Sequence, residues 1–542
     1  MTAAAGPGGG LGRSTRSMAI GTIASRGTGF VRNAAIAAVL GVTGVGAAYN
    51  VANTTPNIVY ELLLGGILTS VLVPLLVRAA KNDERAGQIY AQQLLTLVVV
   101  VLLVASAVLV LLAPQLVGLY AANAAPADRD LAVVLARFFL PQMLFYGAGA
   151  VLGAILNTRG RFGPPMWAPV VNNLVVIGTC GLFLALPGIS PLRSGTITTT
   201  QLVVLGLGTT LGIVAQTVAL VPSLRAAGFS FRPRWGLPGV GDLGRLARWV
   251  LLYVVANQVA YVVVVRLAND EALNAMGRGY ASYVNAFVLW QLPHAVVAVS
   301  VITALLPRMS RAAADDRLDD LRAQLNRGLR LTVTVLVPAA VAYLVLGRVL
   351  ATVVFGHLRT TDEQAHFIGV LLAVFAFGLV PFSVYQLQLR AFYALQDTRT
   401  PTLINLCVNV TLVVVDVTLY ALLPDRYAVL GLAAGHACSF LAGLALCSRV
   451  LSRRLAGLDG ALVMRTAVRC LAAAALPGLV AAGLVAGVVA ALGDGQVGSL
   501  SALLLGSAVL GAGYVLAARR LRITELDEII GPVLGRLGLA RG

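Results

Sequence analysis

Two arginines lie inside the first apolar segment of the chain, ASRGTGFVRNAAIAAVLG at 24–41. A charge near the centre of a bilayer helix costs about 2.5 to 3.5 kcal/mol on insertion scales, so such a residue needs a partner or water. Arg26 and Arg32 are six positions apart, which on a helix separates them by about 9 Å along the axis and roughly 120° around it. This spacing excludes a tight clamp on one group but allows both arginines to border one wide cavity.

Polar side chains recur at three- or four-residue steps in other apolar segments, the spacing of one helical face. Ionisable and amide side chains inside a membrane span normally face the bundle or a water-filled cavity. We therefore interpret these residues as the lining of a polar chamber: Asn50, Asn53, Asn57 and Glu61 in the second expected span, Asn257 in the seventh, Gln291 in the eighth, and Asn405, Asn409 and Asp416 in the eleventh.

Only two acids, Glu61 and Asp416, lie well inside expected spans. The alternative to a ligand-binding role is an ion pair between Glu61 and the first-span arginines. One acid can neutralise only one arginine, so one positive charge would remain unpaired. A net positive, polar-lined cavity instead suits an anion such as a phosphate or diphosphate, which arginine engages through charge-assisted, often bidentate hydrogen bonds.

The elements that carry these residues are apolar helices. The chain has 542 residues, of which 58% are hydrophobic and 11% charged, a composition outside the range of soluble proteins and typical of a polytopic membrane protein. A span needs about 20 mostly apolar residues. Such segments predict fourteen helices, near 17–41, 47–77, 90–114, 131–156, 165–187, 199–222, 246–267, 279–306, 327–347, 364–394, 401–423, 427–450, 466–491 and 498–518.

The net charge of +18 is explained by topology. If the N-terminus is cytoplasmic, 30 of the 40 Lys and Arg residues lie in cytoplasmic connections, which is the positive-inside pattern. We therefore expect a multi-pass protein of the bacterial cytoplasmic membrane with both termini cytoplasmic, and no nucleic-acid partner.

An internal repeat divides the chain. VPLLVRAA at 73–80 resembles LPRMSRAA at 306–313, and the NTR sequence at 157–159 follows Pro141 at the distance at which the DTR sequence at 397–399 follows Pro381. Offsets of 233 and 240 residues indicate two parallel six-helix lobes, an arrangement typical of transporters. The predicted organisation is a flexible cytoplasmic tail at 1–16, an N-lobe at 17–222, an inter-lobe loop at 223–245, a C-lobe at 246–450, two further helices within 451–518, and a cytoplasmic tail at 519–542.

No enzymatic or metal-binding pattern is evident. The four histidines are scattered without an HExxH, no GxSxG occurs, and the five cysteines sit in apolar runs without a CxxC pair. We expect neither a catalytic residue nor a metal or cofactor, and interpret the protein as a secondary transporter. Asp416, together with Asp397 and Arg399 of the DTR sequence, is a candidate coupling or gating residue.

Several stretches together resemble the MurJ/MviN lipid II flippases of the multidrug/oligosaccharidyl-lipid/polysaccharide exporter superfamily. The carrying sequences are ASRGTGFVRNAAIAAVLG, NTTPNIVYELLLGGILTSVLVPLLVRA, GAILNTRGRFGPPMWAPVVNN, WQLPHAVVAVSVITALLPRMSR and RAFYALQDTRTPT. The resemblance implies alternating-access transport of an undecaprenyl-diphosphate-linked peptidoglycan precursor, lipid II, with Arg26 and Arg32 matching the first-span arginines of the family. It also implies a role in cell-wall biogenesis and cell shape, with other cell-wall synthesis proteins as partners.

The chain departs from the family pattern in its charges. Many relatives carry an arginine pair where Tyr60 and Glu61 stand here, and their eighth-span arginine falls in NAFVLWQLP. Because Lys81 is the only lysine, we expect a divergent branch resembling actinobacterial forms. Two alternatives stay open: a flippase or related exporter for another polyprenyl-linked glycan, and a non-transporting scaffold for cell-wall assembly.

Overall fold

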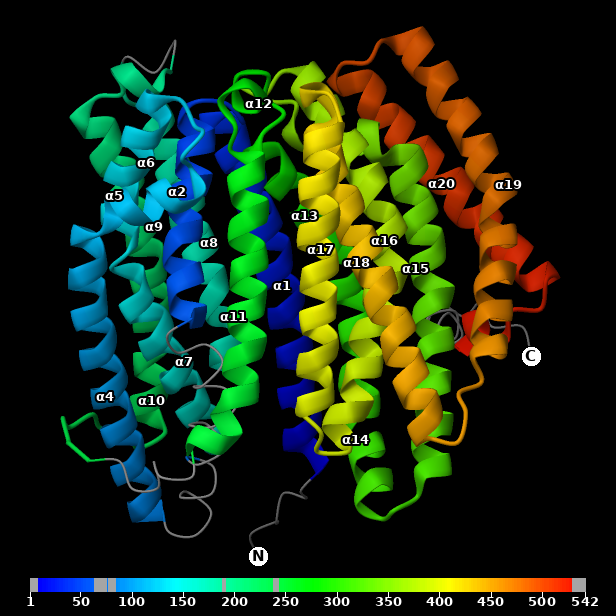
Figure 1. Ribbon diagram of the computed structural model, residues 1–542, viewed down its shortest axis with the longest axis horizontal. Helices are drawn as coiled ribbons and strands as arrows, with labels where there is room; N and C mark the ends of the chain where they lie inside the picture. The colour runs from blue at the N-terminus through cyan, green and yellow to red at the C-terminus, as the bar shows by residue number, and fades with distance from the viewer. Residues whose placement is uncertain (1–7, 63–75, 77–83, 188–191, 237–242, 529–542) are drawn as a thin grey trace, which may run out of the picture. The chain divides into compact units, whose positions relative to one another are not determined.

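The computed structural model describes residues 8–62, 76, 84–187, 192–236 and 243–528, and the regular elements within these ranges are all helices. The chain forms two compact units, Met1–Ala275 and Met276–Gly542 (Figure 1). Helix α1 already begins at Gly8, inside the segment that we assigned to a flexible tail.

The first unit contains helices of very different lengths, from full spans to single turns. Its α-helices are α1 (Gly8–Leu40), α2 (Val45–Tyr60), α4 (Glu84–Leu111), α5 (Ala113–Tyr120), α6 (Pro126–Phe139), α7 (Gln142–Thr158), α8 (Gly163–Leu184), α9 (Thr199–Val218), α10 (Val221–Ala226), α11 (Leu243–Ala268) and α12 (Glu271–Ala275), with a 3-10 turn η3 at Ser194–Thr196.

The second unit is built mainly from long helices. They are α13 (Tyr280–Pro293), a π-helical turn η5 (His294–Ala298), α14 (Val299–Ala314), α15 (Leu318–Phe355), α16 (Asp362–Ala394), α17 (Arg399–Leu422), α18 (Asp425–Arg454), α19 (Gly460–Leu492) and α20 (Gln496–Arg520).

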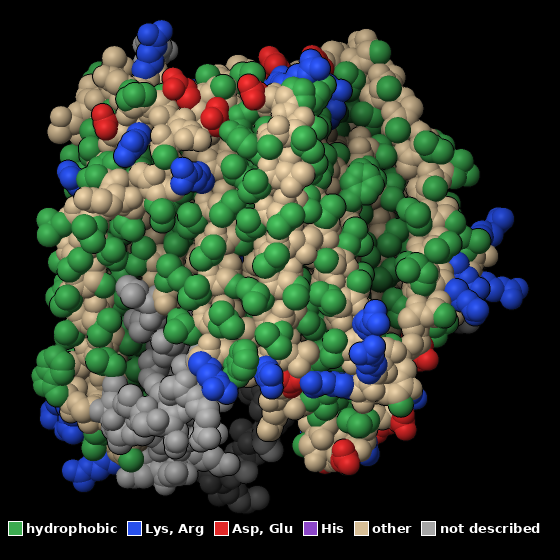
Figure 2. All heavy atoms as spheres, viewed as in Figure 1, with side chains coloured by type: hydrophobic (Ala, Val, Ile, Leu, Met, Phe, Trp, Pro, Cys, Tyr) green, Lys and Arg blue, Asp and Glu red, His purple; other side chains and the backbone are tan. Residues whose placement is uncertain are grey.

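Twelve helical stretches among the described residues are long and apolar enough to cross a membrane. They coincide one for one with the third to fourteenth spans expected from the sequence, and Figure 2 shows hydrophobic side chains covering the middle of the helices on the visible face. The first two expected spans fall on α1 and α2, while 63–75 and 77–83, including most of the first repeat copy, lie outside the described residues. The all-helical membrane fold is thus confirmed, and the total of fourteen spans stays a prediction.

Local sequence signals explain where several helices begin. Proline stands in the first turn of α5, α6 and α8, where its missing N–H costs no helical hydrogen bond. Helices α9 and α16 each start with a capping box, in which Thr198 pairs with Gln201 and Thr361 with Gln364.

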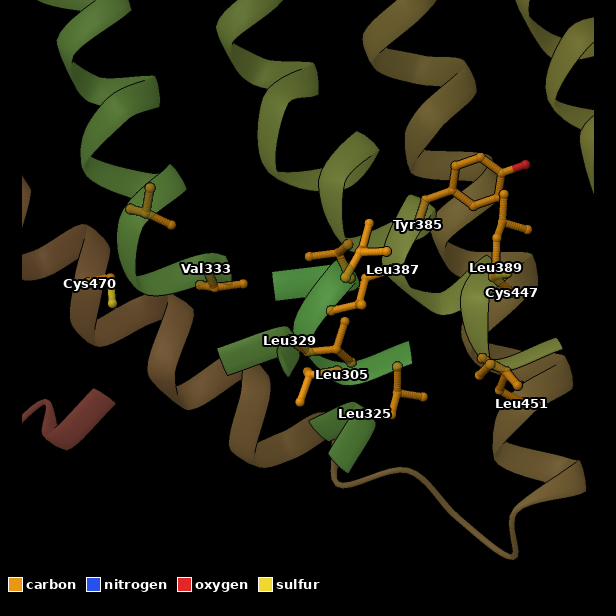
Figure 3. Packing of buried hydrophobic residues seen from close by; sticks show 14 of the residues in the cluster. Leu305, Leu325, Leu329, Val333, Tyr385, Leu387, Leu389, Cys447, Leu451 and Cys470 are labelled. Carbon is orange, nitrogen blue, oxygen red and sulfur yellow. The ribbon is translucent and has the colours of Figure 1, made fainter. Parts of the chain in front are cut away.

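Each unit has its own apolar core. In the first unit, buried side chains of α4, α7 and α10 pack together around Leu94, Val98 and Leu102. In the second unit the core extends over α14, α15, α16, α18, α19 and α20, and Figure 3 shows Leu305, Leu329 and Leu387 meeting where three of these helices converge.

Helix α11 was predicted as the first helix of the C-lobe, but the first compact unit extends through it to Ala275. Within that unit α11 contacts α5, and the backbone N–H of Glu271 donates to the carbonyl of Asn123 at 2.9 Å. The predicted lobe boundaries themselves stay predictions.

Helices α15 and α16 cross in backbone contact at two glycines. A Cβ on Gly369 would lie 2.5 Å from the Cα of Arg348 and 2.6 Å from the carbonyl oxygen of Gly347. We expect Gly369→Ala to destabilise the protein by about 1 to 3 kcal/mol, because two backbones must move apart. Gly487→Ala on α19, where a Cβ meets nothing within 4 Å, is the matched control. Thermal unfolding in detergent, followed by fluorescence-detected size exclusion, measures both; equal unfolding temperatures would contradict the close crossing.

Candidate functional site

Helix α1 carries both predicted arginines and is fixed in rotation by α8. Its small side chains form the contact: a Cβ on Gly21 would lie 2.9 Å from Nε1 of Trp167, so only glycine fits there without movement. Asn173 of α8, which is buried, donates from Nδ2 to the carbonyl of Ser25 at 3.2 Å and to Oγ1 of Thr28 at 2.9 Å. These polar contacts determine which face of α1 turns away from α8.

The two arginines have different surroundings. Arg26 is exposed, and a Cβ on the adjacent Gly27 would meet nothing within 4 Å, so this side of α1 is open. Arg32 is half-buried; its Nη2 and Nε donate to Oδ1 of Asn33 at 3.2 and 3.4 Å.

The alternative ion pair with Glu61 is not formed. Within the described part of the chain neither Arg26 nor Arg32 is in an ion pair. Glu61 caps the C-terminal end of α2 and is exposed. Helices α1 and α2 diverge from the turn that joins them (Figure 1). Glu61 at the end of α2 is therefore on a different helix from the arginines of α1, and the two helices separate along their length.

The predicted stripe on α2 lies on one side of the helix. Asn50 and Asn53 are half-buried and Asn57 is exposed, whereas Tyr49 and Val51 on other faces are buried. The amides bond mainly to the helix itself, since Nδ2 of Asn50 donates to Gly46 O at 2.8 Å and Nδ2 of Asn57 to Asn53 O at 3.0 Å.

Both halves of the repeat interrupt a helix at the same position. A π-helical turn begins at Glu61 after α2 and another at His294 after α13, and these residues are separated by the repeat offset of 233. Nδ1 of His294 lies 2.9 Å from Oγ of Ser383 on α16. Such π turns are frequent at functional sites, and their positions correspond by the internal repeat.

Two further predicted lining residues, Asn257 and Gln291, are half-buried in separate helices, whereas the predicted Asn405 and Asn409 are buried in α17. Asn257 lies in the middle of α11 and Gln291 near the end of α13. Each belongs to a different compact unit, so a common chamber for the whole set stays a prediction.

Asp416 is buried in α17 with no exposed surface. Neither carboxyl oxygen has a hydrogen-bond partner among the described residues. A Cβ on Gly435 of α18 would lie 1.7 Å from Oδ1, so only glycine leaves room for this carboxyl group. A carboxylate without partners is costly in an apolar interior, which favours a neutral or cation-bound form.

The other two candidate gating residues lie at the turn between α16 and α17. Asp397 forms an ion pair with Nη1 of Arg454 at 2.5 Å and accepts from the backbone N–H of Thr400 at 3.0 Å. Burial opposes ionisation of Asp397, but the hydrogen bonds from Thr400 and Arg454 outweigh it and hold its pKa below the ordinary value. Arg399 is exposed at the start of α17.

Sequence reasoning missed the polar groups inside the first unit. Asn173 was not among the residues predicted to line the site, although it lies in the span expected at 165–187. A cavity of about 450 Å³ between α2, α7, α8 and α9 is lined by Tyr60, Tyr146 and Gln216 among others. In the described residues no group of three or more His, Cys, Asp or Glu side chains is arranged to hold a metal.

Comparison with known proteins identifies relatives along most of the chain. A family model described as lipid II flippase MurJ matches residues 36–504. A probable lipid II flippase MurJ of Rhizobium meliloti is 28% identical over 405 residues, covering 72% of either chain. A probable lipid II flippase MurJ of Vibrio cholerae is 26% identical over 441 residues, 79% of this chain and 80% of its own.

Solved structures share the fold. Lipid II flippase MurJ in an inward closed conformation aligns with a TM-score of 0.71 at 19% identity, covering 93% of this chain and 99% of that chain. An inward-facing multidrug resistance MATE family transporter of the MOP superfamily aligns with a TM-score of 0.61 at 14% identity, covering 81% and 98%. Because the family model covers well over half of the sequence, the chain belongs to the lipid II flippase MurJ family of multi-pass membrane transporters.

Proposed function

We propose that the protein is a lipid II flippase, which moves an undecaprenyl-diphosphate-linked peptidoglycan precursor across the bacterial cytoplasmic membrane by alternating access. Family membership supports this activity. The main support for the proposed site is the state of Arg26. Its side chain is exposed and has no ion-pair partner among the described residues, and it lies on a helix expected to span the membrane.

A cation of this kind requires water or an anion, because an unsolvated charge at membrane depth costs several kcal/mol. The diphosphate of the precursor supplies an anion that arginine can bind through two parallel hydrogen bonds. In the proposal Arg26 is the first contact for the diphosphate. Arg32, which already bonds to Asn33, attracts the diphosphate electrostatically from a more buried position.

The asparagine stripe on α2 suits the uncharged part of the head group. Asn53 and Asn57 present amide groups on a face that is partly open, and such groups can exchange hydrogen bonds with sugar hydroxyls or with water. The paired π turns after α2 and α13 support bending of corresponding helices during alternating access. With the positive-inside pattern, both termini are cytoplasmic in this proposal.

Replacement of Arg26 tests the site. We expect Arg26→Ala to abolish rescue of cells depleted of the native flippase, and Arg26→Lys to restore it only partly, since an ammonium group cannot bind a diphosphate in a bidentate fork. The measurement is exposure of lipid II on the outer leaflet, with membrane accumulation of each variant checked in parallel. Arg137→Ala, at an exposed arginine of α6, is the matched control and should transport normally. Normal rescue by Arg26→Ala would instead favour the scaffold hypothesis.

Asp416 is proposed to carry the coupling charge, by exchanging a proton or a monovalent cation. We expect Asp416→Asn, which keeps the shape but cannot ionise, to lose stimulation of lipid II translocation by an imposed ion gradient in proteoliposomes. Asp425→Asn, at the exposed start of α18, should respond as the wild type does. If Asp416→Asn still follows the gradient, the coupling charge lies elsewhere while the flippase activity stands.

A further inference from the structure

A basic pocket in the first unit is lined by none of the residues assigned to transport. It is lined by α4, by the turn after α7 and by the end of α10, has a volume of about 530 Å³, and contains Arg159 and Arg161. We call it the corner pocket. Its volume is within the range of small-ligand sites, roughly 300 to 1,000 Å³.

The corner pocket is at the expected boundary between bilayer and water. Candidate spans end at Thr158 and Ala226, and another begins at Arg85, all beside the pocket. Ligands that reach such a pocket come from the aqueous phase or from the headgroup layer of the lipid.

The two arginines are held in place but keep free donors. Nη1 of Arg159 donates a hydrogen bond to the carbonyl oxygen of Ala227. Nη2 of Arg161 donates to the carbonyl oxygen of Ala226 at 2.8 Å. The guanidinium of Arg159 also lies over the ring of Phe229, 5.6 Å from its centroid. Each guanidinium has five N–H groups, so others can face the pocket, and no ion pair is recorded for either arginine in the described part of the chain.

The internal repeat shows that the two units share the arginine at this turn, Arg159 and Arg399, but differ in the residue two positions before it. In the second unit the matching turn begins with Asp397, whose carboxylate binds Arg454 within the protein. In the first unit the corresponding residue is Asn157, which is neutral. The turn that contains Arg159 therefore lacks the acid that the second unit has at this position.

An aromatic and basic segment beside the pocket is suited to the headgroup layer. Residues 229–235, the aromatic strap, are tied to α4: Nε2 of Gln92 donates to Ser230 O at 2.8 Å and the N–H of Arg234 donates to Thr96 Oγ1 at 3.1 Å. Phe231 and Trp235 of the strap are 47% and 72% exposed. Aromatic rings of this kind are enriched at membrane interfaces, and Figure 2 shows basic side chains at the lower left of the view, over the lower part of α4 and the segment that follows α10.

From these observations we propose that the corner pocket binds the phosphate group of an anionic membrane phospholipid, with Arg159 and Arg161 as donors and the aromatic strap holding the lipid at the interface. Charge complementarity selects an anionic headgroup, as in other basic pockets between spans. None of the residues assigned to transport lines the pocket, so in this proposal its lipid is a bound component of the membrane and not the transported substrate.

Lipid binding by the purified full-length protein tests the proposal. Native mass spectrometry in mild detergent would compare phosphatidylglycerol with phosphatidylcholine of the same chain length. We expect tighter binding of phosphatidylglycerol, and a loss of about fivefold in Arg161→Gln, because one arginine near a surface phosphate contributes that order of affinity. Arg225→Gln removes an exposed cation from the end of α10 that does not line the pocket and should keep wild-type binding.

A second variant avoids removing an arginine. Asn157→Asp introduces the acid that the second unit has, and we expect it to weaken phosphatidylglycerol binding while the protein stays folded. Inorganic phosphate, titrated against bound phosphatidylglycerol, distinguishes the sources of the anion and should not displace the lipid at equal concentration. Equal losses in Arg161→Gln and Arg225→Gln, equal binding of the two lipids, or displacement by phosphate would each overturn the lipid assignment.

Discussion

The orientation of one cation on α1, Arg26, is the constraint on which the proposed transport site depends. Asn173 bonds the side of α1 that carries Ser25 and Thr28. Successive residues are about 100° apart around a helix. Because Ser25 faces α8, Arg26 lies on a different face of α1, away from this contact. The small residues of α1 thus do more than allow close packing, since they decide that the guanidinium faces outward and is not buried against a neighbouring helix.

The duplicated architecture uses charge differently in its two halves. At the turn after the fourth helix of each half, the second unit satisfies Arg454 internally with Asp397, whereas the first unit has Asn157 and an arginine-lined pocket. At the π turns, Glu61 is exposed while His294 contacts Ser383. The two halves therefore share the position of a helix interruption, while the polar groups beside it differ.

The membrane fold could be predicted because long apolar segments must be helical where no water can satisfy the backbone. The third to fourteenth spans matched for this reason. Whether Glu61 pairs with an arginine of α1 could not be predicted from the sequence. The sequence gives the position of Glu61 along α2, but not the divergence of α1 and α2 that separates it from Arg26. Likewise Asp416 was recognisable as an acid in a span, but its lack of partners depends on Gly435 of a different helix.

The unequal burial of the two arginines separates their roles. Arg32 is half-buried and bonded to Asn33, so the protein itself satisfies part of its charge. Arg26 is exposed, and its charge can be satisfied first by water and then by a phosphate. A transport site requires such an exchange, because a cation permanently neutralised by a carboxylate would bind an anion only after losing that partner. In the proposed function, the absence of an ion pair at Arg26 within the described residues is therefore the property that allows α1 to bind and release the same anion.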